Sequence, residues 1–373
     1  MAVMYGSFFN ASFVLAGLTT LAYFLYTFRQ YRAAQELQDA KRHDTKHASS
    51  KRAQLKNSRA TAALAVGGVS PIDRFMRTMS GYVSNQANEI GSVRKGAGAL
   101  AVDLSNDREF EVANTAIPVT VETQAYGRLG TILAWITGFC LLMTMMFRTL
   151  MTGHAPWVNL YEASIALAGF LIVFYSFFEL RYKTRALGVL SAGIAFLLLA
   201  FAAWVGTAYD MAVPLAYDKI TPALQDRPIL TIHVSMMIVS YAFFILAFVC
   251  GVMMLAQGDG VKARFGWLPS YDAADELGYK AVIIGFPLLA LGVILGAYWA
   301  NYAWGHYWSW DPKETSALVT WLVYAIYLHA RGLRNMRGRT MAWLLILGFA
   351  ATLFTYFGVS FIIPGLHSYG GVK

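Results

Sequence analysis

Residues 304–314 are the part of the chain whose side chains are best suited to bind a ligand. Their sequence is WGHYWSWDPKE, so eleven residues include three tryptophans, a tyrosine, a histidine, two carboxylates and a lysine. Aromatic residues are common at the depth of lipid head groups, but such a belt needs neither this density nor interleaved acids and bases. Flat aromatic side chains beside charged groups suit a large planar ligand with a polar edge. The stretch therefore predicts a binding loop.

The end of this stretch also predicts the start of a helix. Asp311 is placed to cap the helix, Pro312 takes the first helical position, and Glu314 lies in the first turn. Asp311, Lys313 and Glu314 are the candidates for a general acid, although capping is the favoured role for Asp311. No catalytic residue is assigned beyond these three.

Histidines are the second group of residues that could do chemistry, because neutral imidazole is a good metal ligand. Of the seven, His43 and His47 are four residues apart in a polar, basic stretch. Two ligands alone make a weak metal site, and a solvated helix face is the favoured interpretation there. The remaining five accompany the apolar segments, where ionisable groups are candidates for function. They are His154, His233, His306, His329 and His367.

The composition places these residues in a membrane protein. The 373 residues are 57% hydrophobic and only 14% charged, with a mean hydropathy of +0.47. A soluble domain is about a quarter charged, so a soluble or a disordered protein is excluded. The net charge of +9 indicates basic loops at a lipid surface and not a nucleic-acid partner. Cys140 and Cys250 stand alone in apolar runs, which argues against a disulfide framework and against a zinc site.

About eight apolar segments predict the transmembrane helices of an all-α integral membrane protein. They are 2–28, 129–147, 158–178, 186–209, 228–258, part of 281–310, 315–330, and 340 to about 361. Lys and Arg are concentrated in four links that fall on one side, namely 29–59, 181–185, 259–264 and 331–339. The positive-inside rule makes that side cytoplasmic and puts both termini outside. The loop 302–314 then faces outward.

A polar insertion at 29–127 follows the first helix on the cytoplasmic side. Its first half is basic and predicts either a helical extension or a disordered arm. Its second half, 61–127, has apolar patches and predicts a small folded element. Contact with a partner subunit or with anionic lipid is the expected role of the arm. The predicted domains are the first helix at 1–28, the insertion at 29–127, and a seven-helix domain at 128–373.

A family resemblance rests on the outward loop. The pattern Trp304-Gly-x-x-Trp308-x-Trp310-Asp311-x-Lys313-Glu314 resembles the tryptophan-rich WWD signature of haem-handling proteins. It is most similar to the CcsA/ResC family, called CcsB in some genomes, of the System II cytochrome c biogenesis pathway. Three further segments resemble that family: 153–162, 231–241 around His233, and 357–370 around His367. The resemblance covers about 128–373 and leaves out the insertion.

The resemblance implies a set of haem-binding residues, with haem b as both ligand and substrate. It implies that His233 and His367 hold the haem iron at an outer station, and that aromatic side chains of the loop pack against the ring. It implies that His329 is a ligand at an inner station whose second ligand comes from a CcsB/ResB partner. The binding candidates are His233, His367, His329, Trp304, Trp308, Trp310 and Asp311.

Three other polar residues have less certain assignments. His306 occupies a variable position of the motif, so a wall or solvent position is favoured over ligation. His154 has two open alternatives, contact with a haem propionate or capping of its helix. Glu162 is expected to form an ion pair, for which Arg148 is one partner, or a hydrogen bond, and not to act in catalysis.

The function implied by the resemblance is that of a holocytochrome c synthase, a haem lyase acting with a CcsB/ResB partner. Haem crosses the membrane and is joined by thioether bonds to the CxxCH segment of apocytochrome c on the outer face. A thiol-reducing protein keeps that segment reduced. The location implied is a bacterial inner membrane, with membrane lipid as a further partner and no nucleic acid.

Three alternatives remain beside this hypothesis. One is a System I haem lyase or haem-delivery subunit, CcmF-like or CcmC-like. Another is a transporter whose aromatic loop binds a different planar solute. A dihaem b-type electron carrier is weaker, because it needs paired histidines along the same helices.

Overall fold

The computed structural model describes residues 1–65, 121–213, 228–258, 265, 268–334, 336–363 and 365. Contacts divide the chain into two units, Met1–Ala34 with Glu111–Lys373, and Gln35–Phe110. Helix α1 (Ala2–Ala65) continues into the second unit, so the basic half of the insertion is helical as far as Ala65. The small folded element predicted at 61–127 falls mostly on residues 66–120, which lie outside the described residues.

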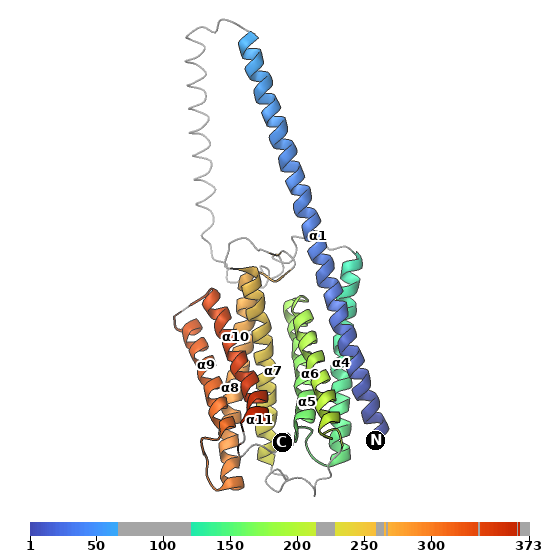
Figure 1. The fold of residues 1–373 in the computed structure, drawn as a ribbon, viewed down its shortest axis with the longest axis vertical. Coiled ribbons are helices and arrows are strands. Elements are labelled where there is room, and N and C mark those ends of the chain that lie inside the picture. Colours follow the sequence, from blue (N-terminus) through green and yellow to red (C-terminus); the bar gives the residue numbers. More distant parts are fainter. Residues whose placement is uncertain are drawn as a thin grey trace. The chain divides into compact units, whose positions relative to one another are not determined.

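Every secondary-structure element in the described part of the first unit is a helix, which confirms the all-α prediction. Figure 1 shows its helices running side by side. After α1 they are α4 (Val121–Thr152), α5 (Leu160–Tyr182), α6 (Leu187–Ala208), α7 (Pro228–Gln257), α8 (Tyr271–Trp304), α9 (Pro312–Gly332), α10 (Arg339–Leu353), the π-helical η3 (Phe354–Gly358) and α11 (Val359–Ile362). The last three form one continuous rod, which we call the last helix.

Seven of the described helices are long and apolar enough to cross a membrane, and the chain is a multi-pass membrane protein. They are α1 over Ala2–Leu37, α4, α5, α6, α7, α8 and the last helix. Helix α9, predicted as the span 315–330, is less apolar and is not among them. Its 21 residues nevertheless extend about 31 Å at 1.5 Å per residue. Eight spans and outward termini therefore stay predictions.

The two ends of the helices are named here after the predicted orientation. The outer end carries residues 153–159 and 305–311, and the inner end is opposite. A buried carboxylate joins the inner ends of α1, α4 and α5. Glu179 is 3% exposed and has four partners, Tyr23, Thr131, Tyr175 and Arg185. A buried charge is tolerated when it is paired and hydrogen-bonded, so this cluster fixes how these helices meet.

Helices α7 and α8 pack closely because glycines on α8 leave room for side chains of α7. A Cβ atom added to Gly285 would lie 2.9 Å from the ring of Phe244, and one added to Gly292 would lie 2.8 Å from the sulfur of Met237. The two glycines are seven residues apart and so lie on one face of α8. This contact sets the outer end of α7, with His233, against α8.

Candidate functional site

A cavity lies at the outer end, between five elements of the fold. It is partly open to its surroundings, and it encloses about 980 Å³ of empty space when the open side is included. Its walls come from the start of α5, the outer ends of α7 and α8, the first turn of α9, and the last helix. The lining residues are Trp157, Val158, Asn159, Leu160, Ala163, Leu230, His233, Val234, Met237, Ile238, Tyr241, Trp299, Lys313, Tyr356 and Ser360.

His233 is the histidine of this cavity, and its ring is fixed by a backbone hydrogen bond. Its Nδ1 lies 2.6 Å from the carbonyl oxygen of Gly292. A carbonyl can only accept, so Nδ1 carries the proton and the neutral ring has its lone pair on Nε2. Metal-binding histidines usually donate their other ring N–H to a carbonyl or carboxylate in this way. The side chain predicted as an iron ligand therefore has the tautomer that ligation by Nε2 requires.

Gly296 makes space for the His233 ring one turn beyond Gly292. A Cβ atom at Gly296 would lie 2.6 Å from Cε1 and 2.8 Å from Nδ1 of His233. Carbon atoms in proteins do not approach so closely, so any larger residue at Gly296 must displace the imidazole. Gly292 and Gly296 together form the seat of His233, one through its carbonyl group and the other through its missing side chain.

The tryptophans of the outward loop are divided between two places. Trp304 packs edge-on against Trp299, with ring centroids 4.9 Å apart, and Trp299 lines the cavity. Trp308 and Trp310 form a second edge-on pair at 5.7 Å and are not among the lining residues. Trp310 is 69% exposed. The structure thus brings Trp304 next to the cavity wall, and packing of Trp308 and Trp310 on a ligand stays a prediction.

Asp311 and Glu314 hold the loop to the start of α9. They form a capping box, in which the Asp311 carboxylate accepts from the backbone N–H of Lys313 at 3.1 Å. Glu314 accepts from the backbone N–H of Ser309 at 2.8 Å and of Asp311 at 3.2 Å. These bonds close the turn around Trp310, whose φ of 60° is rare for a bulky residue. The predicted capping role of Asp311 is confirmed.

Lys313 is the one candidate acid that lines the cavity. Its backbone belongs to the first turn of α9, and its side chain is partly buried. Burial lowers the pKa of its ammonium group, and the negative charge of Asp311 opposes that effect. The cavity therefore has a cationic group in its wall whose charge is not fully solvated.

Two tyrosines line the cavity where the last helix departs from α-helical geometry. Tyr356 lies within the π-helical segment η3, and its hydroxyl group is 3.0 Å from the Ser164 hydroxyl of α5. Tyr241 of α7 meets it edge-on, with centroids 6.3 Å apart. Single π-helical turns occur often at functional sites. Here the turn places Tyr356 and Ser360 on the same cavity.

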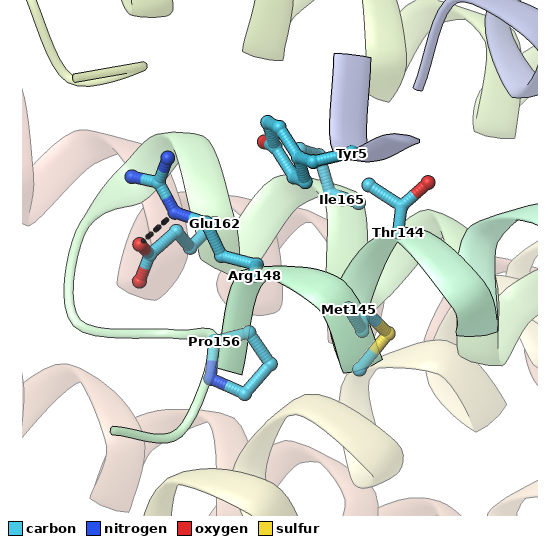
Figure 2. A pocket seen from close by; sticks show the side chains of 7 residues that line it. All are labelled: Tyr5, Thr144, Met145, Arg148, Pro156, Glu162 and Ile165. Carbon is cyan, nitrogen blue, oxygen red and sulfur yellow. Dashed lines mark hydrogen bonds and ion pairs between the residues drawn. The ribbon is translucent and has the colours of Figure 1, made fainter. Parts of the chain in front are cut away.

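A buried ion pair supports the wall formed by the start of α5. Arg148 of α4 and Glu162 of α5 are 2.7 Å apart, and each side chain is 2% exposed. The pair adjoins a smaller cavity of about 170 Å³, where Figure 2 shows Tyr5 beside the Arg148 guanidinium group. Glu162 also accepts from the Val158 backbone N–H at 3.0 Å. The predicted pairing of Glu162 with Arg148 is confirmed.

The same arginine holds the chain after α6. Its guanidinium group donates to the carbonyl oxygen of Ala212 at 2.7 Å, and to those of Met211 and Val213 at 3.4 Å. Asn159, the N-cap of α5, donates to the Met211 carbonyl group at 3.2 Å. Arg148 and Asn159 therefore tie α4, α5 and the segment after α6 into one support behind the cavity.

The remaining histidines lie elsewhere. His329 is exposed in the last turn of α9 at the inner end, two residues before Arg331, whose guanidinium group is 2.7 Å from buried Asp275. His306 is exposed in the outward loop, as its predicted solvent position requires. The side chains of His43 and His47 and all of His367 lie outside the described residues.

His154 does not cap its helix. It lies in the loop before α5, with Nδ1 2.9 Å from the Ala155 carbonyl oxygen, whereas the N-cap of α5 is Asn159. That alternative was wrong because the loop continues for five residues beyond His154 before the helix begins. Contact between His154 and a propionate stays a prediction.

An all-helical, multi-pass membrane protein with a histidine- and tryptophan-lined cavity at one end is the class that this fold defines. The family model described as "Cytochrome C assembly protein" matches residues 157–367. Proteins described as "Cytochrome c biogenesis protein CcsA" are 34% identical in Pyropia yezoensis over 65% of this chain and 87% of the relative. The corresponding figures are 38%, 64% and 67% in Chlamydomonas reinhardtii, and 38%, 64% and 84% in Guillardia theta.

The chain therefore belongs to the CcsA family of cytochrome c biogenesis proteins. Among solved structures, a chain described as "Cytochrome c Heme Lyase CcmF" aligns with a TM-score of 0.45 at 18% identity, over 63% of this chain and 40% of that one.

Some residues of the cavity were not expected from the sequence. Trp299 and Gly296 belong to an apolar run that predicted only a helix and part of a loop. Their spacing, with Gly292, Gly296 and Trp299 at i, i+4 and i+7, was the available signal, because these positions share one helix face. That spacing does not identify α7 as the helix they face.

The Arg148–Glu162 pair yields the first prediction. Replacing Arg148 by Met leaves the Glu162 carboxylate buried without its cation, so we expect the free energy of unfolding in detergent to fall by about 3–5 kcal/mol. The double variant Arg148→Met/Glu162→Met should recover part of this loss, because no unpaired charge remains. Recovery stays incomplete, because Arg148 also binds backbone carbonyl groups.

The matched control is Arg29→Met. Arg29 pairs with Glu122 on the surface, where the side chains are 39% and 75% exposed, so we expect a change below about 1 kcal/mol. An Arg148→Met variant as stable as Arg29→Met would contradict a supporting role for the buried pair.

Proposed function

We propose that this chain is the CcsA-type subunit of a System II cytochrome c synthase. It receives haem b from the inner side of the membrane and presents it at the outer end for covalent attachment to apocytochrome c. The observation that carries this proposal is the 2.6 Å contact between Nδ1 of His233 and the Gly292 carbonyl oxygen, at the wall of the cavity at the outer end. Membership of the cytochrome c biogenesis family supports it.

The residues of the cavity fit a haem molecule. Nε2 of His233 supplies an iron ligand of the type that haem proteins use. Trp157, Trp299, Met237 and Tyr241 supply aromatic and soft apolar surface, which suits a porphyrin ring. Lys313 adds a positive charge for the acidic edge of the molecule. The lining thus offers a ligand, an apolar wall and a polar group for the three chemically different parts of haem.

His367 is proposed as the second outer ligand. It follows Gly365, the last described residue, by two positions. A Cβ atom on Gly365 would lie 2.5 Å from Oδ1 of Asp311, so the end of the last helix is held at the start of α9. The same first turn carries Lys313, which lines the cavity. The anchoring of Gly365 therefore supports a site that combines His233 and His367.

The proposed reaction joins haem to the two cysteine thiols of a CxxCH segment. Each S–H bond adds across a vinyl group, so that a C–S bond forms and the hydrogen passes to the other vinyl carbon. Thiols are already good nucleophiles, so the contribution of this chain is to hold haem in one position while the segment arrives. Asp311 and Glu314 serve the capping box, which leaves Lys313 as the candidate acid that lines the cavity.

The inner station is proposed at His329, with the second ligand from a CcsB/ResB partner. Its exposed position at the inner end of α9 supports a role that needs a second chain. A thiol-reducing protein is expected to supply reduced CxxCH segments. We propose a bacterial inner membrane, with the outer end facing the periplasm.

The test of the outer station is the absorption spectrum of the chain purified with its partner. We expect His233→Ala and His367→Ala each to lower haem content at least about tenfold, because even a lost supporting group around a metal costs 10–100-fold. Added imidazole should restore binding in both variants. His306→Ala is the matched control, since His306 is exposed in the outward loop and is not among the lining residues of the cavity. A wild-type complex without haem that still matures cytochrome c would refute the proposal.

The seat of His233 gives a second test. Gly296→Ala should lower haem affinity about 10–100-fold, because the new methyl group displaces the imidazole from its bond to Gly292. Gly193→Ala in α6 is the control, since a Cβ atom there meets only Thr20 at 3.8 Å. Titration of the apoprotein with haem measures both. Equal affinities in the two variants would mean that His233 is not the ligand.

If His329 is a ligand at an inner station, the delivery of haem should depend on it, whereas the binding of haem at the outer cavity should not. His329→Ala should lower the haem content of complexes isolated from cells about tenfold, by analogy with the outer ligands. The affinity of the outer cavity for haem added in detergent should not change, because α9 puts His329 at the opposite end. If both quantities fall together, His329 acts on folding and not on the route of haem.

A further inference from the structure

The cavity has an unbalanced charge. Among the fifteen lining residues that belong to the described part of the chain, the groups that can be positively charged are Lys313 and His233, and none is Asp or Glu. His233 is the proposed iron ligand, a role that uses the neutral ring, so the ammonium group of Lys313 is the positive charge that the wall supplies. A cavity of this kind favours a ligand with an acidic group.

Three described carboxylates of the outer end are committed to the structure. Asp311 caps α9, Glu314 closes the turn at Ser309, and Glu162 pairs with Arg148. Within the described residues no carboxylate oxygen is recorded within 4 Å of Lys313 Nζ. Lys313 therefore lies in the cavity wall without an ion-pair partner from the described part of the protein.

The position of Lys313 is unfavourable for a cation in two ways. It is withdrawn from solvent, which lowers the pKa of its ammonium group, and it lies in the first turn of α9, where the helix dipole is positive. Each of these costs would be offset by an anion bound in the cavity. An uncharged residue would serve packing better, so the placement points to a ligand.

Trp157 adds a second donor to the same cavity wall. Trp157 is one of the lining residues, and its indole Nε1–H is buried with no acceptor among the described residues. A buried donor without a partner costs about 1–3 kcal/mol, so such groups usually mark a place that a ligand or water completes. Trp157 comes from the start of α5 and Lys313 from α9, so the two donors are contributed by separate elements.

We propose that Lys313 and Trp157 form a carboxylate-binding corner of the cavity, which holds a propionate group of haem. Lys313 is then a positioning residue and not the general acid. Because propionates and vinyl groups occupy opposite edges of haem, holding the propionate edge leaves the vinyl edge for the incoming thiols. This inference rests on the proposed function, since it assumes that haem is the ligand.

The test compares haem with its dimethyl ester, in which both propionates lose their charge. The full chain with its partner is titrated with each compound in detergent. Wild type should bind haem about tenfold or more tightly than the diester, as expected for a hydrogen bond to a charged group. Lys313→Met should lose most of that preference by weakening haem binding alone. Lys313→Arg should keep the preference, because it keeps the charge.

Two further variants keep the test decisive. Trp157→Phe retains an aromatic ring and removes the N–H group, so we expect a smaller loss of preference, of about threefold. Lys280→Met is the control, because Lys280 pairs with Glu276 on the surface of α8 and does not line the cavity. His233→Ala should weaken haem and diester alike and leave their ratio unchanged.

The outcomes separate this inference from the proposed function. If wild type binds both compounds equally, or if Lys313→Met weakens both by one factor, the carboxylate corner is refuted although haem binding stands. If neither compound binds to the wild-type complex, the proposed function itself fails. A variant that keeps the wild-type preference but loses thioether formation would make Lys313 the acid instead.

Discussion

The close contact of α7 with α8 is the constraint on which the candidate site depends. Glycines at one face of α8 let side chains of α7 approach to a distance that any Cβ atom would prevent. The same face then offers the Gly292 carbonyl group to His233 and, two helical turns later, Trp299 to the cavity. Packing and chemistry are thus set by one surface. If α7 and α8 were held further apart, His233 would lose its contacts with Gly292 and Gly296 while the helices could still form.

The charged side chains of the outer end also serve the packing of the helices. Three described carboxylates of the outer end complete a helix cap or an ion pair. Asp311 and Glu314 form the start of α9, and Glu162 anchors the start of α5 through Arg148. The cavity is left with basic and aromatic groups. Helix termini that meet around it therefore decide its polarity as well as its shape, because the acids that cap them are no longer available inside.

The sequence predicted the helices well, because apolar runs and basic links are properties of each segment alone. The cap at Asp311 and Glu314 was predictable for the same reason. The cavity was predictable only in part. His233 was singled out, whereas Trp299 and Gly296 gain meaning only once α7 lies against α8. The orientation of the Trp310 side chain was not predictable, because it depends on a left-handed backbone conformation. Sequence rules expect that conformation at glycine or asparagine.

The last helix contains one turn, η3, that is wider than the others. In η3 the Val359 N–H bonds to the Phe354 carbonyl group, so this turn holds one residue more than an α-helical turn. An α-helix rotates by about 100° for each residue, and the wider turn takes up the extra residue. Loss of one residue from 354–358 would return this segment to α-helical geometry and leave the residues after it on nearly the same faces of the rod. Ser360 would then keep its place at the cavity wall. Among related chains, a one-residue deletion at this point would shorten the rod without redirecting its end, whereas the same deletion elsewhere in the rod would turn everything after it by more than a quarter of a revolution.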